Sequence, residues 1–505
     1  MRTGDNRAGA GGDPRHPNPL PPHQAAEAAL DFNTASSPWE GRLRSHHDAL
    51  GPLRALARPV PGIAPRLREL LPDGRPRTVY IHVPFCTHNC TFCNLNRRWA
   101  TPPPDYADLL VQEIESFSDY PYVTGGVYGA VYFGGGTPTI LAPQDLKRVI
   151  RALRRNLDIA PDVEITVETT VSDLTPAHIH ALREAGVNRI SVGIQTFCDR
   201  GRRYLGRWGS GEEAARKLEE LLSAGFRNVG IDLIYNWPGQ TPAELAADME
   251  TIRSLDLAGV SFYPLILHRG ARIMDLLSSG ALPPMGDISH EKRLFDLIWE
   301  ELRGAGFELL ELTKLVRPGR DEYRYVAIRY AGGDTLGLGA GAGGKLGDLL
   351  YLNPSDPEKY RARVEAGAVG SSPWSGALLR MGRPHPGHGT RRGPPPGVIG
   401  LIRTLGISSR VPPLYDLAYR LVGAVEFDRF CWGEFPRWVR EVLAPELVGL
   451  EEMGLVRLTP EGFSLTRDGV FWGHNIARDL ARAVIEAEKV GGTPAVDPRR
   501  HRGGR

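Results

Sequence analysis

The sequence predicts an α/β protein built on a partial barrel of six β/α units, followed by a small winged-helix-like domain. Between about residues 78 and 343, short runs of β-branched residues alternate with amphipathic stretches of helix length. Strands that alternate with helices at this spacing predict a parallel sheet. Residues 412–486 have a different pattern, which is two helices, two short strands around a TPEG turn and a last helix.

Each predicted strand is a short run rich in Val, Ile, Tyr or Phe. The strands are predicted at 78–84, 130–133, 164–168, 189–194, 228–235 and 260–265. The helices are predicted at 104–117, 143–155, 174–185, 211–224, 242–255 and 287–304. Six such units favour a partial TIM-type (β/α)6 barrel over an open sheet, and its chemistry would lie at the carboxyl ends of the strands.

The chain divides into five regions by composition. We expect an N-terminal extension at 1–75, disordered at its start because residues 1–28 are rich in Gly, Pro, Ala and Asn. The barrel core follows at 76–345, and a linker at 346–411 contains a Pro-, Gly- and Arg-rich loop at 380–397. The C-terminal domain covers 412–486, and 487–505 is expected to be a disordered tail.

Charge and cysteine content exclude several classes of protein. The 505 residues include 61 Lys and Arg against 59 Asp and Glu, a formal charge of +2, which does not favour bulk binding to nucleic acid or to a membrane surface. No apolar run is long enough to cross a bilayer. Five Cys cannot form a disulfide framework and suit a reducing compartment. We therefore expect a cytoplasmic protein with a small-molecule substrate and neither a nucleic-acid nor a membrane partner.

The strongest motif is a cysteine loop directly after the first strand. Cys86, Cys90 and Cys93 are spaced C-x3-C-x2-C, and three of the five cysteines therefore fall within eight residues. Three thiolates can bind three irons of a 4Fe-4S cluster and leave the fourth iron open to a small molecule. A zinc ion is the alternative, with His82 or His88 as the fourth ligand.

Four motifs together resemble the radical S-adenosylmethionine (SAM) superfamily. They are YIHVPFCTHNCTFC at 80–93, VYFGGGTPTIL at 131–141, SVGIQTF at 191–197 and IDLIYNWPGQT at 231–241. The order and the C-terminal LEEMGLVRLTPEGF resemble more closely its oxygen-independent coproporphyrinogen III oxidase-like (HemN-like) branch. The resemblance implies that SAM chelates the open iron. An external flavodoxin- or ferredoxin-type donor then supplies an electron that cleaves SAM to a 5′-deoxyadenosyl radical.

The resemblance also assigns residues to the first SAM. The glycine tract after the second strand would bind the methionine amine, and acidic, amide and guanidinium side chains after later strands would bind the rest. These residues are Gly135, Gly136, Thr137, Glu168, Gln195, Arg207 and Asp232. An acid inside an apolar run such as VGIDLIY is costly unless partnered, so a ligand role for Asp232 is favoured over a structural ion pair. Tyr80 and Phe92 would line this site, with plain core packing as the alternative.

A second glycine tract at 332–344 resembles the LGLGAGA segment of the branch. The resemblance implies that Gly337, Gly339 and Gly341 contact a second SAM. No strand–helix–strand unit with a downstream acid follows the tract, so a dinucleotide-binding interpretation is poor.

Two departures from the branch direct the functional prediction. Leu95 stands where coproporphyrinogen dehydrogenases carry a further Cys, and residues 321–337 lack the His-Asn-x-x-Tyr-Trp motif of heme chaperones. We therefore expect radical methylation or cyclopropanation of an unsaturated carbon in a natural product, with the second SAM as donor. The alternatives are a porphyrin- or heme-related protein (a coproporphyrinogen III dehydrogenase, a heme chaperone or a heme-degrading enzyme) and a winged-helix DNA-binding protein. The last helix lacks the basic face that DNA binding requires.

Overall fold

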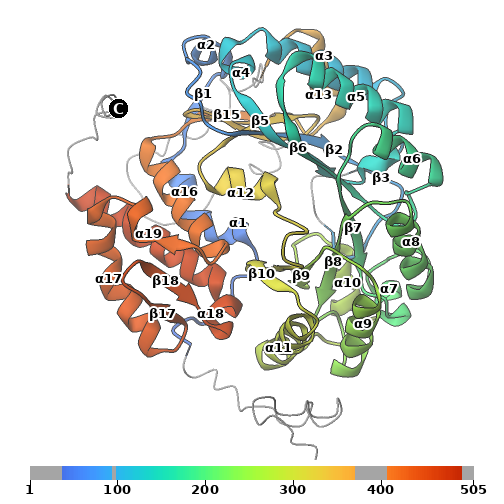
Figure 1. The fold of residues 1–505 in the computed structure, drawn as a ribbon, viewed down its shortest axis with the longest axis vertical. Helices are drawn as coiled ribbons and strands as arrows, with labels where there is room; N and C mark the ends of the chain where they lie inside the picture. The colour runs from blue at the N-terminus through green and yellow to red at the C-terminus, as the bar shows by residue number, and fades with distance from the viewer. Residues whose placement is uncertain (1–36, 94–97, 370–405, 492–505) are drawn as a thin grey trace, which may run out of the picture. The chain divides into compact units, whose positions relative to one another are not determined.

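The computed structural model describes residues 37–93, 98–369 and 406–491 and contains one large mixed sheet. Seven neighbouring strands of this sheet are parallel (Figure 1). In spatial order they are β12 (Asp334–Leu338), β2 (Arg77–Val83), β5 (Val127–Gly135), β6 (Asp158–Thr169), β7 (Arg189–Gln195), β8 (Asn228–Tyr235) and β9 (Gly259–Pro264). Within the described residues the sheet does not close on itself, so the fold is a partial barrel.

The six predicted strands and six predicted helices are confirmed. The helices are α3 (Tyr106–Ser118), α5 (Pro143–Asn156), α6 (Pro176–Glu184), α8 (Gly211–Ser223), α9 (Pro242–Ser254) and α11 (Ile288–Gly304). Side-chain caps define where several of them begin. Ser210 and Glu213 form a capping box at α8, and Thr241 and Glu244 form another at α9. Each box satisfies backbone N–H groups that the first turn leaves without partners.

The structure adds strands that the sequence pattern does not predict. Beyond β12 lie the antiparallel strands β13 (Gly343–Leu346), β14 (Leu349–Leu352), β15 (Ile407–Arg410) and β1 (Arg58–Val60); beyond β9 lie β11 (Lys314–Val316) and β10 (Glu308–Glu311). The segment expected as a linker therefore contributes β14, helix α13 (Pro357–Glu365) and β15. The Pro-rich loop at 380–397 lies outside the described residues.

The inner face of the sheet is covered by a short helix, α12 (Arg324–Tyr330), which Figure 1 shows on the concave side. Successive side chains of a strand point to opposite faces. Val79 and Ile81 are fully buried, whereas Tyr80 between them packs against the inner cluster of Tyr132 and Tyr325. The inner face of these strands is therefore aromatic.

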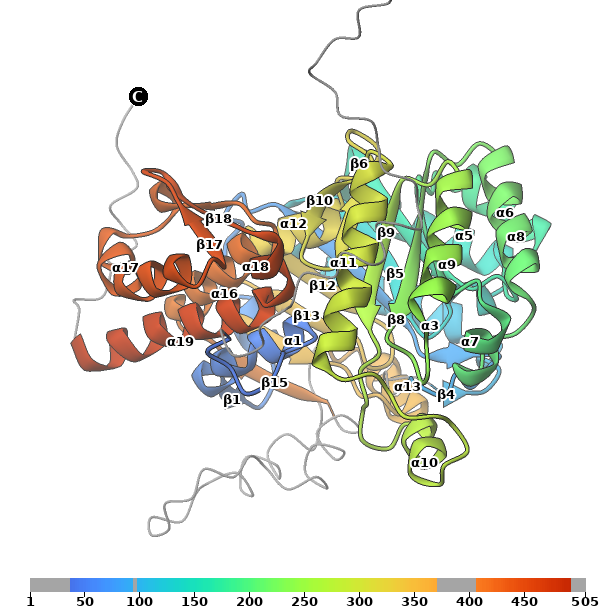
Figure 2. The ribbon, with the colours of Figure 1, turned by 90° about the horizontal axis from the view of Figure 1, so that it is seen from below.

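The C-terminal part contains the predicted helices and strands. It comprises α16 (Pro413–Glu426), β16 (Phe430–Cys431), α17 (Arg437–Glu452), β17 (Val456–Leu458), β18 (Gly462–Leu465), α18 (Arg467–Phe471) and α19 (Gly473–Gly491). Helix α19 extends five residues past 486, into the region expected to be a disordered tail. It packs against α16, α17 and α1 (His46–Ala49), as seen from below in Figure 2. The domain boundaries themselves stay predictions.

Shorter elements complete the described chain. They are η2 (Gly51–Leu56), α2 (Ala64–Leu67), β3 (Phe85–Cys86), β4 (Arg98–Trp99), α4 (Pro121–Thr124), η3 (Pro138–Ile140), α7 (Asp199–Tyr204), α10 (Arg272–Ser278) and η4 (Trp432–Glu434). Across the three described ranges, no helix combines the length and the apolar character needed to span a membrane.

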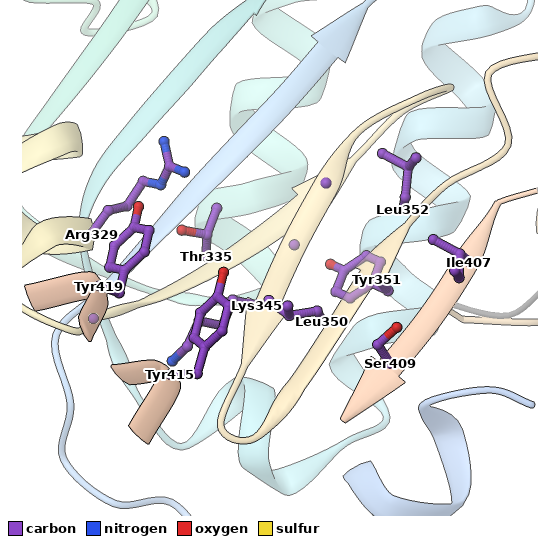
Figure 3. Close-up of a pocket in the computed structure, with 13 residues that line it drawn as sticks. Arg329, Thr335, Lys345, Leu350, Tyr351, Leu352, Ile407, Ser409, Tyr415 and Tyr419 are labelled. Atoms are coloured by element: carbon purple, nitrogen blue, oxygen red, sulfur yellow. The ribbon is translucent and has the colours of Figure 1, made fainter. Parts of the chain in front are cut away.

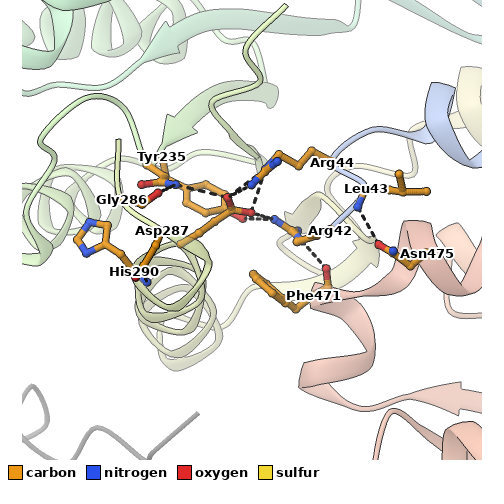
Figure 4. A network of polar contacts seen from close by, with 11 residues as sticks. Arg42, Leu43, Arg44, Tyr235, Gly286, Asp287, His290, Phe471 and Asn475 are labelled. Carbon is orange, nitrogen blue, oxygen red and sulfur yellow. Dashed lines mark hydrogen bonds and ion pairs between the residues drawn. The ribbon is translucent and has the colours of Figure 1, made fainter. Parts of the chain in front are cut away.

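A buried arginine joins the N-terminal segment, the barrel and the C-terminal helices (Figure 4). Arg42 Nη1 donates to Glu291 Oε1 at 2.6 Å and to Tyr235 Oη at 3.1 Å, and its Nε donates to the carbonyl oxygen of Phe471 at 2.5 Å. Arg44 pairs with the other oxygen of Glu291 at 2.8 Å. The Glu291 side chain is completely buried, so its charge depends on these two guanidinium groups.

Candidate active site at the carboxyl ends of the strands

The cysteine loop begins where β2 ends and is anchored to the other side of the barrel. The backbone N–H of Thr91 donates to Leu205 O at 3.1 Å, and its hydroxyl donates to Tyr204 O at 2.7 Å. Phe92 packs against the buried cluster that contains Leu205 and Trp237. Core contacts thus hold the middle of the loop, and the cysteines lie on either side of that anchor.

Two of the three sulfurs face hydrogen-bond donors. The Thr137 hydroxyl lies 3.6 Å from Cys86 Sγ, and Arg207 Nη1 lies 3.1 Å from Cys90 Sγ. Positive charge and donors beside a sulfur favour the thiolate, which is the form that binds iron. Among the described residues, no three His, Cys, Asp or Glu side chains are grouped around one metal position.

The glycine tract closes tightly over the start of the cysteine loop. Gly136 N donates to Val83 O and Thr137 N to Phe85 O, both at 2.8 Å. A Cβ on Gly136 would lie 2.4 Å from Phe85 O, so only glycine fits there. Gly135 has a φ of +109° and lies over the imidazole of His82. These contacts place the predicted residues Gly135, Gly136 and Thr137 directly beside Cys86.

Glu168 ends β6 next to the same tract. Its Oε1 accepts from the Tyr132 hydroxyl at 2.5 Å, and its Oε2 accepts from Gly135 N at 3.3 Å. Burial raises the pKa of the Glu168 carboxyl to about 7, Asp232 adds to the rise, and the Tyr132 hydrogen bond opposes it. The carboxyl therefore changes its charge close to neutral pH.

This shifted pKa predicts a pH-dependent affinity for SAM. If the ionised carboxyl binds the ribose hydroxyls, binding below pH 7 must first remove a proton from Glu168. We expect the affinity to fall about tenfold between pH 8 and pH 6, measured by anaerobic equilibrium dialysis. Glu168→Gln cannot titrate and should show a flatter profile, which also separates this effect from the titration of SAM itself. Equal slopes in the two proteins would contradict the assignment.

Gln195 and Arg207 meet at the end of β7. Gln195 has a φ of +72°, which is unusual for a residue with a Cβ, and follows an irregularity in the β7–β8 register. Strain of this kind concentrates at functional sites. Arg207 Nη2 donates to Gly193 O, and Gln195 Nε2 lies beside the same glycine. Arg207 therefore connects the end of β7 to Cys90.

Asp232 lies in β8 on the inner face, opposite Gly193 of β7. Burial raises the pKa of its carboxyl, and Lys314 and Arg189 oppose the rise. Both cations are already paired with Asp321, Arg189 through two bonds of 3.0 Å. In the described part of the chain Asp232 itself forms no ion pair. This arrangement favours a ligand role, which stays a prediction.

The second glycine tract has its backbone donors occupied by the protein. Gly337 N donates to the Tyr351 hydroxyl at 2.8 Å, Gly339 N to Glu113 Oε2 at 2.7 Å, and Gly341 N to Pro354 O at 2.9 Å. Gly337 and Gly339 lie beside Tyr80 and His82 of β2. Contact of these glycines with a second SAM stays a prediction, but their N–H groups are not available for it.

Sequence reasoning missed an array of tyrosines on the inner face. Tyr325 of α12 stacks on Tyr132 with ring centroids 4.6 Å apart and on Tyr80 at 6.1 Å. Tyr80, which the resemblance places beside the first SAM, has its hydroxyl hydrogen-bonded to His82 Nδ1 at 2.8 Å. The alternation of VYF in β5 could have shown that Tyr132 faces inward. The sequence pattern does not reveal that a seven-residue helix covers it.

A three-cysteine loop and a glycine tract at the carboxyl ends of parallel strands are together typical of one class of barrel enzymes. The radical SAM superfamily model matches residues 80–252, which include the cysteine loop and β5 to β8. Anaerobilin synthase of Escherichia coli O157:H7 is 29% identical over 408 residues, covering 80% of this chain and 84% of that protein. Heme chaperone HemW of Lactococcus lactis is 33% identical over 289 residues, covering 57% and 74%.

A solved structure has the same fold. Coproporphyrinogen III oxidase (HemN) from Escherichia coli aligns with a TM-score of 0.61 at 22% identity, covering 86% of this chain and 92% of that one. The chain belongs to the radical SAM superfamily, in its HemN-like branch. Its cofactors are accordingly a 4Fe-4S cluster and SAM, and Cys86, Cys90 and Cys93 would hold the cluster. Bound there, a cluster supplies the low-potential electron that cleavage of SAM requires.

The prediction of radical methylation or cyclopropanation is wrong. The relatives named above concern heme, anaerobilin and coproporphyrinogen, which points to the porphyrin- or heme-related alternative. The prediction relied on two absent motifs, and such motifs separate members of a branch without defining the substrate class. Leu95, one of the two departures, lies outside the described residues. The other departure is the segment 321–337, in which residues 324–330 form α12.

Proposed function

We propose that this chain is a radical SAM enzyme that acts on a tetrapyrrole. The observation that carries the proposal is the similarity to anaerobilin synthase, which extends over 408 residues and 80% of this chain. The superfamily model matches only residues 80–252, so the similarity reaches well beyond the part that all members share. Coproporphyrinogen III oxidase of Escherichia coli, 29% identical over 329 residues, supports the same substrate class.

The inner face of the barrel suits a flat conjugated ring. Tyr80, Tyr132 and Tyr325 stack with centroid distances of 4.6 to 6.3 Å. Tyr132 and Tyr325 are almost fully buried in this stack, so the partly exposed Tyr80 would offer its ring face to a planar π-system by offset stacking. Burial raises the pKa of Tyr80 and Tyr132 well above the usual phenol value, so both remain neutral O–H donors at physiological pH.

The proposed roles of the site residues follow from their positions. Glu168 and Asp232 would accept hydrogen bonds from SAM, and Arg207 would hold both the end of β7 and the Cys90 thiolate in place. The tyrosines would keep the substrate flat against the inner face and exclude water from it. A fixed substrate position matters because a carbon radical must meet its target C–H bond before it meets a C–H or S–H bond of the protein.

Binding of heme without chemistry is a second candidate. The observation that favours it is the 33% identity to heme chaperone HemW, the highest identity among the relatives described above. Against it, residues 321–337 lack the His-Asn-x-x-Tyr-Trp motif that the chaperones carry.

Anaerobic turnover with candidate tetrapyrroles tests the proposal. Reconstituted protein, SAM and reductant would be incubated separately with heme, coproporphyrinogen III and a non-tetrapyrrole polyene as control. We expect one tetrapyrrole to be consumed and to raise the yield of 5′-deoxyadenosine, with no response to the polyene. Cys90→Ala should still bind that tetrapyrrole but not consume it. Heme bound but never consumed would favour the carrier, and no binding of any tetrapyrrole would exclude both.

A further inference from the structure

A cavity of about 340 Å³ lies between α12, the strands β12 to β15 and helix α16 (Figure 3). Its two ends differ in chemistry. Arg329, Tyr415 and Tyr419 stand together at one end, Leu350 lies in the middle, and Leu352, Ile407, Tyr351 and Ser409 lie toward the other end, as the figure shows. The cavity therefore combines one polar end with an aliphatic wall.

The two cations of this cavity differ in their partners. Lys345 Nζ lies 3.0 Å from Asp416 Oδ1 and 3.6 Å from Asp334 Oδ1, so its charge is balanced by the protein. Across the described ranges Arg329 forms no ion pair with any carboxylate. Its guanidinium lies over the ring of Tyr325 at 5.2 Å, and its electrostatic neighbours include the phenols of Tyr419, Tyr330 and Tyr323 and the imidazole of His46. The Arg329 side chain lines the cavity and is only partly buried, so an anionic ligand that enters the cavity can pair with its guanidinium.

Stacked tyrosines connect this cation to the candidate active site. Arg329 lies over Tyr325, Tyr325 stacks on Tyr132 at 4.6 Å, and the Tyr132 hydroxyl donates to Glu168. A ligand whose acid group lies at Arg329 would therefore be separated from Glu168 by this stack of buried rings. A cavity of about 340 Å³ with one unpaired guanidinium suits one acidic side chain of a larger ligand.

We propose that this cavity is a carboxylate subsite for the substrate, with Arg329 as the group that binds the acid. This inference rests on the proposed function where it identifies the acid as a side chain of a tetrapyrrole. Arg329 presents two parallel N–H donors to a carboxylate, and hydroxyls of Tyr415, Tyr419 and Thr335 line the same cavity. The leucines would pack against the methylene groups that carry the acid. Arg329 would thus fix which edge of the substrate faces the radical.

A fluorescent aromatic acid tests the subsite without any tetrapyrrole. Binding of pyrenebutyrate and of its neutral methyl ester to the holoenzyme would be measured by fluorescence anisotropy. We expect the acid to bind more tightly than the ester, and Arg329→Met to weaken the acid about 10- to 100-fold while leaving the ester unchanged. Arg324→Met is the matched control, because Arg324 lies on the same helix but pairs with Asp162 at 2.9 Å.

Two further measurements allow the result to contradict the proposal. Arg329→Lys keeps the charge and should restore much of the preference for the acid even if Arg329→Met folds poorly. Equal binding of acid and ester by the unchanged protein, or equal loss of both in Arg329→Met, would overturn the subsite. Protoporphyrin and its dimethyl ester, used in the same assay, separate the two proposals. If the protein prefers pyrenebutyrate to its ester but binds neither porphyrin, the carboxylate subsite stands and only the proposed substrate class is overturned.

Discussion

Replacing Cys90 with alanine is expected to reduce cleavage of SAM to the level of a protein-free control. Cys90 is one of three cysteines that would hold the cluster, and Arg207 Nη1 lies 3.1 Å from its sulfur. With two ligands left, the loop cannot hold three irons, and the guanidinium loses its anionic partner. Iron content, visible absorption and 5′-deoxyadenosine formation after anaerobic reconstitution measure the effect.

Two other cysteines provide matched controls for this change. Cys198 contacts Glu244 at 3.5 Å beside α7, and Cys431 lies in β16 of the C-terminal part. Alanine at either position removes a thiol without touching the cysteine loop, so iron and cleavage should be retained. A Cys90→Ala protein with full iron content and undiminished 5′-deoxyadenosine formation would refute the assignment of the loop.

Replacing Glu291 with glutamine is expected to lower the free energy of unfolding by about 3–5 kcal/mol. The substitution keeps the shape of the side chain but leaves Arg42, whose side chain is 3% exposed, without its counter-ion. Arg44 loses its partner at the same time. Denaturant titration followed by tryptophan fluorescence measures the change.

A salt bridge on the same helix gives the control for Glu291. Glu301 of α11 pairs with Arg253 where both side chains are partly exposed, so Glu301→Gln should cost no more than about 1 kcal/mol.

The ion pairs of Glu291 also make stability depend on pH. Burial alone would raise the pKa of the Glu291 carboxyl, but pairing with Arg42 and Arg44 leaves that pKa below the usual carboxyl value. The stabilisation is therefore present above that usual pKa and is lost as the pH falls through the lower folded value. Equal losses of unfolding free energy in Glu291→Gln and Glu301→Gln would show that the buried ion pairs stabilise the protein no more than an exposed one.

The sequence could predict the parallel strands because each is a continuous apolar run. The run NVGIDLIY has the same bounds as β8. Such a nearly continuous apolar run is what a parallel strand buried on both faces requires. It could not predict β12, because the glycines of LGLGAGAGG resemble a loop. In the structure only glycine fits at position 337, because a Cβ there would lie 2.3 Å from Gly343 O. Helix α12 is too short to show a helical period.

The candidate site was predictable where motif and strand end coincide. Cys86, the glycine tract and Glu168 are each adjacent to a strand whose end the apolar pattern marks. Arg329 is different, because its surroundings come from α12, β13, β14 and α16, which are far apart in the chain. Short motifs could not predict the substrate class, because they differ among members of one branch, whereas the similarity to anaerobilin synthase extends over 80% of this chain.

The anchoring of residues 39–44 has a practical consequence for protein engineering. Trp39 donates to Asp479 at 2.6 Å, Leu43 to Asn475 at 2.8 Å, and Arg42 binds both Glu291 and the backbone of Phe471. A shortened version that starts at β2 would leave the buried carboxylate of Glu291 without its two arginine partners. It would also remove hydrogen bonds that hold α19. Affinity tags and fusion partners should therefore be attached upstream of residue 37, and minimal catalytic fragments should retain this short arm.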